Sequence, residues 1–206
     1  MYEDIWNPSN VVGDYFERRI SRLFGLIRMD VNEEGLVPDF RARDQSFYVE
    51  CKASSRKSSS GGVIKGEQIS RFLDEIEQRR FYALAFHPII DKMVSAYPTA
   101  RRLKNALAKT SDQVEYFIFP FSVICAFYVS KKPRYKYRDR KKREPFTTLS
   151  YNEARRIFSL DTEYFASLGL DPKQYQQREL HERVHILTRQ GRLEAELVKS
   201  FHPEFL

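Results

Sequence analysis

The side chains with the clearest chemical potential in this sequence are two carboxylates and an amine, at Asp39, Glu50 and Lys52. Carboxylate oxygens are the ligands that Mg²⁺ prefers, and proteins usually hold that ion with one or two carboxylates together with phosphate and water. An ammonium group beside such an ion can orient a phosphate and stabilise developing negative charge. These three residues therefore predict phosphate chemistry with Mg²⁺, for which Mn²⁺ can substitute, provided that the fold brings them together.

Two strand-like segments, residues 37–43 and 46–53, would bring them together through a tight hairpin at Asp44 and Gln45. In that register Asp39 lies directly opposite Glu50. The other face collects apolar pairs, which a slip of one residue would destroy: Phe40 with Val49, and Ala42 with Phe47. Strand alternation also points Glu50 and Lys52 to one face and turns Cys51 towards the core. Two carboxylates about 5 Å apart at Cβ repel each other, and a divalent cation between them removes that cost.

Pro38-Asp39, followed on the next strand by Glu50-Cys51-Lys52, resembles the PD-(D/E)XK nuclease superfamily. The position of Glu17, after Gly13 on the first predicted helix, resembles that of a helix glutamate in archaeal Holliday-junction resolvases. The similarity covers residues 10–86. It implies a restriction-endonuclease-like α/β fold, with a mixed central β-sheet flanked by helices, and Mg²⁺-dependent hydrolysis of phosphodiester bonds in DNA.

The resemblance also implies roles for individual residues. Asp39, Glu50, the Cys51 backbone carbonyl and Glu17 would hold the ion, and Gln68 falls where many members carry a polar residue near the site. Lys52 would act in its protonated form, because neighbouring carboxylates favour the charged amine. The alternative is an exposed hairpin with a surface salt bridge between Glu50 and Lys52, since acid-x-Lys also occurs at Asp171-Pro172-Lys173, where no strand is expected.

A second motif, His181-Glu182-Arg183-Val184-His185, matches H-E-x-x-H, in which two histidines one helical turn apart bind zinc and the glutamate acts as general base. Its surroundings are charged, with arginines and glutamate at 178, 179 and 183. A solvated surface helix with two incidental histidines is therefore favoured over a zinc peptidase.

The positive charge of the chain is concentrated in one segment. The whole chain has 35 Lys+Arg, 28 Asp+Glu and a net charge of +7. Residues 131–143 contribute nine basic residues and one acid, so the remainder is close to neutral. Two tyrosines interrupt this run, which suits phosphate contacts with some base stacking; a solubilising linker is the alternative. The predicted DNA contacts are Arg56 and Lys57 beside the site, and Lys131, Lys132, Arg134, Lys136, Arg138, Arg140, Lys141, Lys142 and Arg143.

The remaining composition excludes several classes of protein. The longest apolar-rich run, residues 117–129, is shorter than the roughly 20 residues of a membrane span and contains Pro120. The N-terminal residues resemble no secretory signal, and two cysteines cannot form a disulfide framework. We therefore expect a soluble, intracellular, cytoplasmic protein without a membrane partner.

The elements that must position the site follow from periodicity and caps. We expect helices from a cap at Asn10, over 68–76, over 100–109, after the Ser150-x-x-Glu153 capping box, and from Asp171-Pro172 towards Gln190. We expect strands over 81–86, 114–119 and 123–129, and a polar loop over 54–62.

The sequence thus predicts three regions: a nuclease-like α/β core over 1–130, a basic connector over 131–143 and a helical extension over 144–206. The favoured activity is a metal-dependent DNA endonuclease acting on branched, Holliday-junction-like DNA, with a homodimer to match two-fold-symmetric substrates. A sequence-specific restriction endonuclease and a non-catalytic DNA-binding protein remain as alternatives, and the zinc peptidase ranks last.

Overall fold

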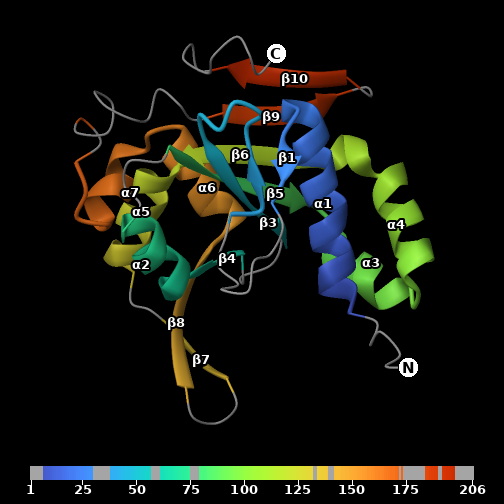
Figure 1. The fold of residues 1–206 in the computed structure, drawn as a ribbon, viewed down its shortest axis with the longest axis horizontal. Helices are drawn as coiled ribbons and strands as arrows, with labels where there is room; N and C mark the ends of the chain where they lie inside the picture. Colours follow the sequence, from blue (N-terminus) through green and yellow to red (C-terminus); the bar gives the residue numbers. More distant parts are fainter. Residues whose placement is uncertain are drawn as a thin grey trace.

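A seven-stranded mixed sheet forms the centre of the protein, and helices cover both of its faces (Figure 1). The computed structural model describes residues 7–29, 38–56, 61–74, 79–131, 134–138, 142–171, 173, 184–189 and 192–197. In spatial order the strands are β1 (Ile27–Arg28), β2 (Phe40–Arg41), β3 (Tyr48–Ser55), β5 (Arg80–His87), β6 (Glu115–Pro120), β9 (Val184–Arg189) and β10 (Arg192–Leu197). β3 and β5 are parallel, and the other neighbours are antiparallel. The predicted α/β class with a mixed, helix-flanked sheet is confirmed.

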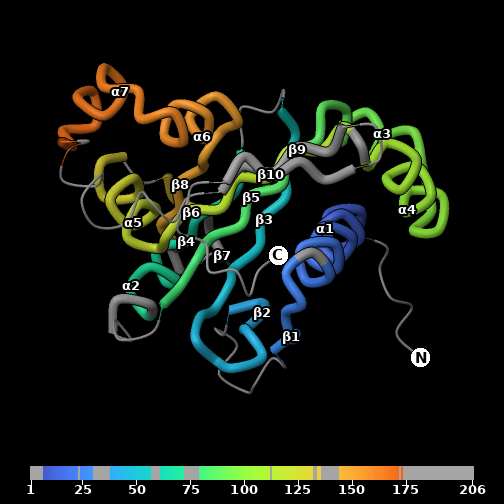
Figure 2. The backbone as a smooth tube through the Cα atoms, turned by 90° about the horizontal axis from the view of Figure 1, so that it is seen from above, coloured from blue at the N-terminus to red at the C-terminus, as the bar shows by residue number. Residues whose placement is uncertain are grey.

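The helices form two layers, one on each face of the sheet (Figure 2). One layer contains α1 (Pro8–Phe24), α3 (Ile90–Ala96) and α4 (Ala100–Lys109), and the short 3₁₀ helix η1 (Ser111–Gln113) follows α4. The other contains α2 (Gly66–Asp74), α5 (Phe121–Ser130), α6 (Tyr151–Phe158) and α7 (Thr162–Ser167). None of the helices in the described residues has both the length and the apolar character needed to cross a membrane.

Strand β5 is shared by two hydrophobic cores. Successive side chains of a strand point to opposite faces, so Phe81, Ala83 and Ala85 join the core beneath α1, α3 and α4. Tyr82, Leu84 and Phe86 join the core beneath α2, α5, α6 and α7. All eight residues of β5 are buried, which confirms the predicted buried strand over 81–86.

Helix α1 begins earlier than expected. The predicted cap at Asn10 is wrong, because Asn7 is the N-cap, with its side chain accepting from the Ser9 N–H and Pro8 in the first turn. The helix ends at Gly25, whose φ of 60° is the left-handed conformation that favours glycine. Its buried stripe includes Phe16 and Ile20, as the periodicity predicted.

The hairpin between β2 and β3 has the expected register with a wider turn. Phe40 pairs with Val49 and Arg41 with Tyr48, as predicted. The Ala42 N–H donates to the Phe47 carbonyl at 2.9 Å, which continues the register to the end of the ladder. The predicted two-residue turn is wrong, because the backbone turns over residues 43–46, with Gln45 at a φ of 63°.

A second, three-stranded sheet contains the segment expected to be a basic connector. β4 (Gly62–Lys65) pairs with β8 (Lys142–Leu149), which pairs with β7 (Arg134–Arg138). In Figure 1 the β7 and β8 strands project away from the rest of the molecule. The described parts of 131–143 are therefore largely strand, and β8 continues into the region predicted to be helical.

Two further assignments from periodicity are corrected. Residues 123–129 lie in helix α5 and not in a strand. The C-terminal region is not purely helical, because α6 and α7 are followed by β9 and β10, which extend the central sheet beyond β6. The helix expected to run from Pro172 towards Gln190 is therefore wrong over 184–189, and residues 174–183 lie outside the described residues.

Candidate active site

The two predicted carboxylates lie close together where β2 and β3 of the central sheet meet. Asp39 directly precedes β2, and its Oδ2 accepts a 2.6 Å hydrogen bond from the backbone N–H of Cys51 in β3. Glu50, the preceding residue of β3, has only 3% of its surface exposed. Burial, followed by the nearby charge of Glu50, raises the pKa of Asp39 to about 7. Both carboxylates are thus held close together with little water around them.

Only one oxygen of Glu50 is satisfied. Oε1 pairs with the Lys52 ammonium and accepts a 2.6 Å hydrogen bond from Gln68 Nε2, at the start of α2. Oε2 is buried and has no hydrogen-bond partner among the described residues, and neither has Gln68 Oε1. A buried oxygen without a partner costs on the order of 1–3 kcal/mol, and more when it is charged. This uncompensated oxygen is the feature of the site that needs an explanation.

Lys52 remains charged in this position. Burial disfavours its ammonium, yet the charges of Glu50 and Asp39 outweigh that effect and raise the pKa of Lys52. About one-fifth of its side chain is exposed. The lysine is therefore a protonated group that reaches the surface beside the carboxylates, and it is poorly suited to act as a general base.

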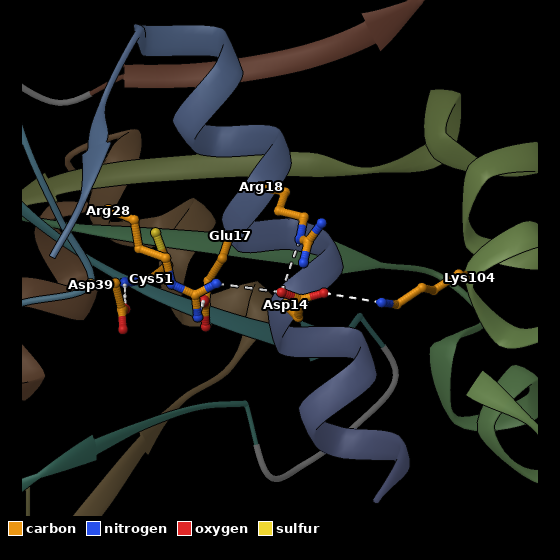
Figure 3. Close-up of polar contacts among 7 residues, drawn as sticks. All are labelled: Asp14, Glu17, Arg18, Arg28, Asp39, Cys51 and Lys104. Carbon is orange, nitrogen blue, oxygen red and sulfur yellow. Dashed lines mark hydrogen bonds and ion pairs between the residues drawn. The ribbon is translucent and has the colours of Figure 1, made fainter. Parts of the chain in front are cut away.

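Glu17 enters a different ion-pair network, drawn in Figure 3. Arg28 of β1 binds Glu17 Oε2 at 3.3 Å and Asp14 Oδ1 at 3.5 Å. Asp14 also pairs with Arg18 at 3.0 Å and Lys104 at 3.2 Å. Burial raises the pKa of Glu17, while the positive charge of Arg28 opposes that rise. Asp14 and Arg28 were not predicted, and nothing in their sequence surroundings distinguishes them from other surface charges.

A cleft of about 750 Å³ opens beside this network. Its walls come from the first turns of α1, the C-terminal half of β3 and helix α3, and they include Gly13, Glu17, Lys52, Ser55 and Asp91. The cleft is therefore bordered by the lysine that pairs with Glu50 and by the glutamate that pairs with Arg28. A ligand in it would meet charged groups of both signs.

The predicted metal ligands are brought together only in part. Among the residues that the structure describes, no three His, Cys, Asp or Glu side chains gather as a metal-binding group. The expectation that Glu17 joins Asp39 and Glu50 as a third ligand is therefore not supported by this geometry. The Cys51 carbonyl does face Asp39, because the N–H and C=O of one strand residue point to the same side and its N–H binds Asp39.

The two carboxylates and this carbonyl nevertheless suit Mg²⁺. The ion takes oxygen ligands and commonly needs no more than two carboxylates from the protein, with water and substrate phosphate completing its shell. A cation would compensate the buried Glu50 Oε2 and the repulsion between Asp39 and Glu50. The residues present thus fit Mg²⁺ or Mn²⁺ at this position.

The residues predicted to bind DNA divide into three groups. Arg56 has internal partners, since it pairs with Glu115 at 2.8 Å, donates to the Gln113 carbonyl at 2.6 Å and lies over the Tyr151 ring. Lys131 pairs with Glu153 at 2.7 Å. Arg134, Lys136, Arg138, Lys142 and Arg143 lie on β7 and β8, whereas Lys57, Lys132, Arg140 and Lys141 lie outside the described residues.

The H-E-x-x-H motif lacks the helix that it needs. His185 lies in β9, paired with Phe117 of β6. His181 and Glu182 lie outside the described residues. Because the zinc motif depends on two histidines one helical turn apart, a strand at His185 contradicts the helical setting on which that alternative depended.

Comparison with protein-family models, curated proteins and solved structures gave no significant match. The functional argument therefore depends on the geometry of Asp39, Glu50 and Lys52.

Proposed function

We propose that this protein is a metal-dependent DNA endonuclease of the PD-(D/E)XK type, which hydrolyses phosphodiester bonds with Mg²⁺ or Mn²⁺. The observation that carries the proposal is the buried Glu50 Oε2, which has no partner among the described residues and lies near the half-buried carboxylate of Asp39. Natural proteins rarely leave such an oxygen uncompensated, and the exceptions concentrate at functional sites.

Each side chain then has a role. Asp39, Glu50 and the Cys51 carbonyl would hold the ion, which would neutralise charge on the phosphate and activate a water molecule. Lys52 orients the scissile phosphate and stabilises the charge that develops on it. Gln68 fixes the carboxylate of Glu50 through its 2.6 Å hydrogen bond, so that the ligand oxygens keep one orientation.

The substrate that the proposal favours is branched DNA, after the resemblance to junction resolvases. A homodimer would match the symmetry of such a substrate, and light scattering would test that state. A sequence-specific restriction endonuclease would use the same residues and differ in the DNA that it selects.

One panel tests the proposal. Four-way junction, flap, single-stranded and plasmid duplex DNA are each incubated with and without Mg²⁺, using wild type, Asp39→Asn and Lys52→Ala. We expect cleavage only by wild type and only with the metal. Cleavage that persists in either variant would overturn the assigned site, and salt-dependent binding without any cleavage would favour a non-catalytic DNA-binding protein.

A further inference from the structure

The most prominent surface feature is the hairpin of β7 and β8, which we call the arm. Residues 134–138 pair antiparallel with residues 142–146. The arm projects from the molecule (Figure 1), on the side of the central sheet covered by α2, α5, α6 and α7. Arg134 is exposed, and Tyr135 has 54% of its surface exposed. The arm therefore presents exposed side chains at Arg134 and Tyr135.

The charge of the arm follows the period of the strand. Arg134, Lys136 and Arg138 occupy alternate backbone positions of β7, the spacing at which a strand repeats. Alternate strand residues are about 6.7 Å apart, close to the axial rise of roughly 6.8 Å over two phosphates of one DNA strand. Lys142 and Arg143 on β8 add positive charge, and Glu144 is the acid of the paired strands.

The root of the arm contacts two elements that neighbour the candidate active site. Near its end, β8 pairs through Leu149 with Gly62 of β4, and a Cβ built on Gly62 would lie 3.5 Å from Lys52 Cβ. Further along β8, Pro145 lies against Gly66, where a Cβ would come within 2.8 Å of the proline ring. Gly66 begins the helix that carries Gln68, the partner of Glu50.

The length of β8 sets how far the arm reaches from the central sheet. From Leu149 to Lys142 the backbone of β8 extends about 23 Å, the length of roughly seven base pairs. A two-stranded β-ribbon is also one of the elements that the major groove of B-DNA admits. The arm is thus long enough to follow a duplex while its root stays beside Lys52 and Gln68.

We infer that the arm grips double-stranded DNA next to the point of cleavage, with Arg134, Lys136 and Arg138 against the phosphates of one groove. The choice of DNA as partner rests on the proposed function; the choice of duplex over single strand rests on the ribbon and its charge spacing. The arm binds all duplex sequences alike, because phosphate contacts carry no sequence information.

The test compares two triple substitutions that remove the same charge. Arg134→Gln/Lys136→Gln/Arg138→Gln alters the arm, and Arg101→Gln/Arg102→Gln/Lys109→Gln alters exposed residues of α4 on the opposite face of the sheet. Binding is measured by fluorescence anisotropy in EDTA, with a duplex of about 20 base pairs and its single strand, over about 50–200 mM KCl. Thermal melting checks that each variant folds, and Lys142→Gln/Arg143→Gln replaces the arm variant if it does not.

We expect the arm variant to lose roughly tenfold or more in duplex affinity and its salt slope to fall by about 2–3, whereas the α4 variant stays close to wild type. Equal binding by the arm variant and wild type, tighter binding of single strand than duplex, or no binding by wild type would each overturn the inference. DNA binding that depends on the arm, without Mg²⁺-dependent cleavage, would instead support the inference about the arm and overturn the nuclease proposal.

Discussion

Glu50 in β3 and Glu153 in α6 differ in how their oxygens are used. Glu153 Oε1 binds Lys131 at 2.7 Å, while Oε2 accepts from the N–H and hydroxyl of Ser150 at 2.9 and 2.8 Å. Burial opposes the charge of Glu153, but these contacts prevail and lower its pKa. Glu50 is more deeply buried, with 3% of its surface exposed, and leaves Oε2 uncompensated among the described residues.

The contrast separates a structural carboxylate, Glu153, from Glu50, which we propose to be a metal ligand. The capping box at Ser150 and Glu153 satisfies the first turn of α6 and stabilises the fold. The pair of Asp39 and Glu50 raises the energy of the folded state without an added cation, because the half-buried carboxylate of Asp39 and the buried one of Glu50 repel each other. Substitutions at the two places should therefore have opposite consequences for stability and activity.

The largest expected effect is on cleavage. Asp39→Asn keeps an acceptor for the Cys51 N–H but removes the charge of a proposed metal ligand, so the rate should fall on the order of a thousandfold. Ser150→Ala is the matched control, since it removes a polar contact of Glu153 and should leave the rate within about twofold. The measurement is the single-turnover rate on the DNA that wild type cuts best. Similar rates for the two variants would contradict the different roles proposed for the two carboxylate sites.

Glu153→Gln should lower stability at neutral pH by about 1–2 kcal/mol, because it breaks the charged contacts with Lys131 and Ser150. A lowered pKa in the folded state gives stability above the ordinary carboxyl pKa of 4.5 that is lost as pH falls through the folded value. The difference from wild type should therefore shrink with acid. Urea unfolding of both proteins from neutral to acidic pH measures this difference in the free energy of unfolding. A difference that does not change with pH would contradict a charged Glu153 in the folded state.

Addition of Mg²⁺ should stabilise only the protein with both carboxylates. At a concentration tenfold above the dissociation constant, the gain is about 1.4 kcal/mol, or about 3–6 °C in melting temperature. Asp39→Asn should melt no lower than wild type in EDTA and should lose this gain. Calorimetry in EDTA, with Mg²⁺ and with Mn²⁺ measures the melting temperature of each protein and its rise with metal. An equal rise in wild type and Asp39→Asn would place the ion elsewhere.

The smallest expected effect is at Glu17. Because Glu17 pairs with the largely exposed Arg28, Glu17→Gln should change stability by less than about 0.5 kcal/mol. Cleavage should fall less than tenfold, since no three acids among the described residues form a metal-binding group. A loss as large as that of Asp39→Asn would restore Glu17 as a ligand and reveal a rearrangement on metal binding.

Local pairing explains why part of the site was predictable. The register of β2 and β3 follows from apolar pairs such as Phe40 with Val49, and that register sets Asp39 beside Glu50. The resemblance placed Gln68 near the site, but its contact with Glu50, like the network of Arg28, depends on how α2 and β1 pack in three dimensions. No spacing along the chain encodes them.

The wrong elements have equally specific causes. Residues 121–130 are apolar on all sides, so a short buried helix and a buried strand look alike. In β10 the residues Leu193, Ala195 and Leu197 alternate with charged residues, a strand pattern that the expected helix obscured. In β7 the charge run hid the alternation, and its partner β8 also pairs with the distant strand β4.

The position of β9 has a consequence for the order in which the protein is made. β9 pairs with β6 along Glu115–Ile118, so until residues 184–189 leave the ribosome β6 is an edge of the central sheet with unpaired backbone groups. Asp39, Glu50 and Lys52 are synthesised long before that edge is closed. The proposed cutting residues are therefore synthesised before the strand that completes the pairing of β6 in the sheet that holds them.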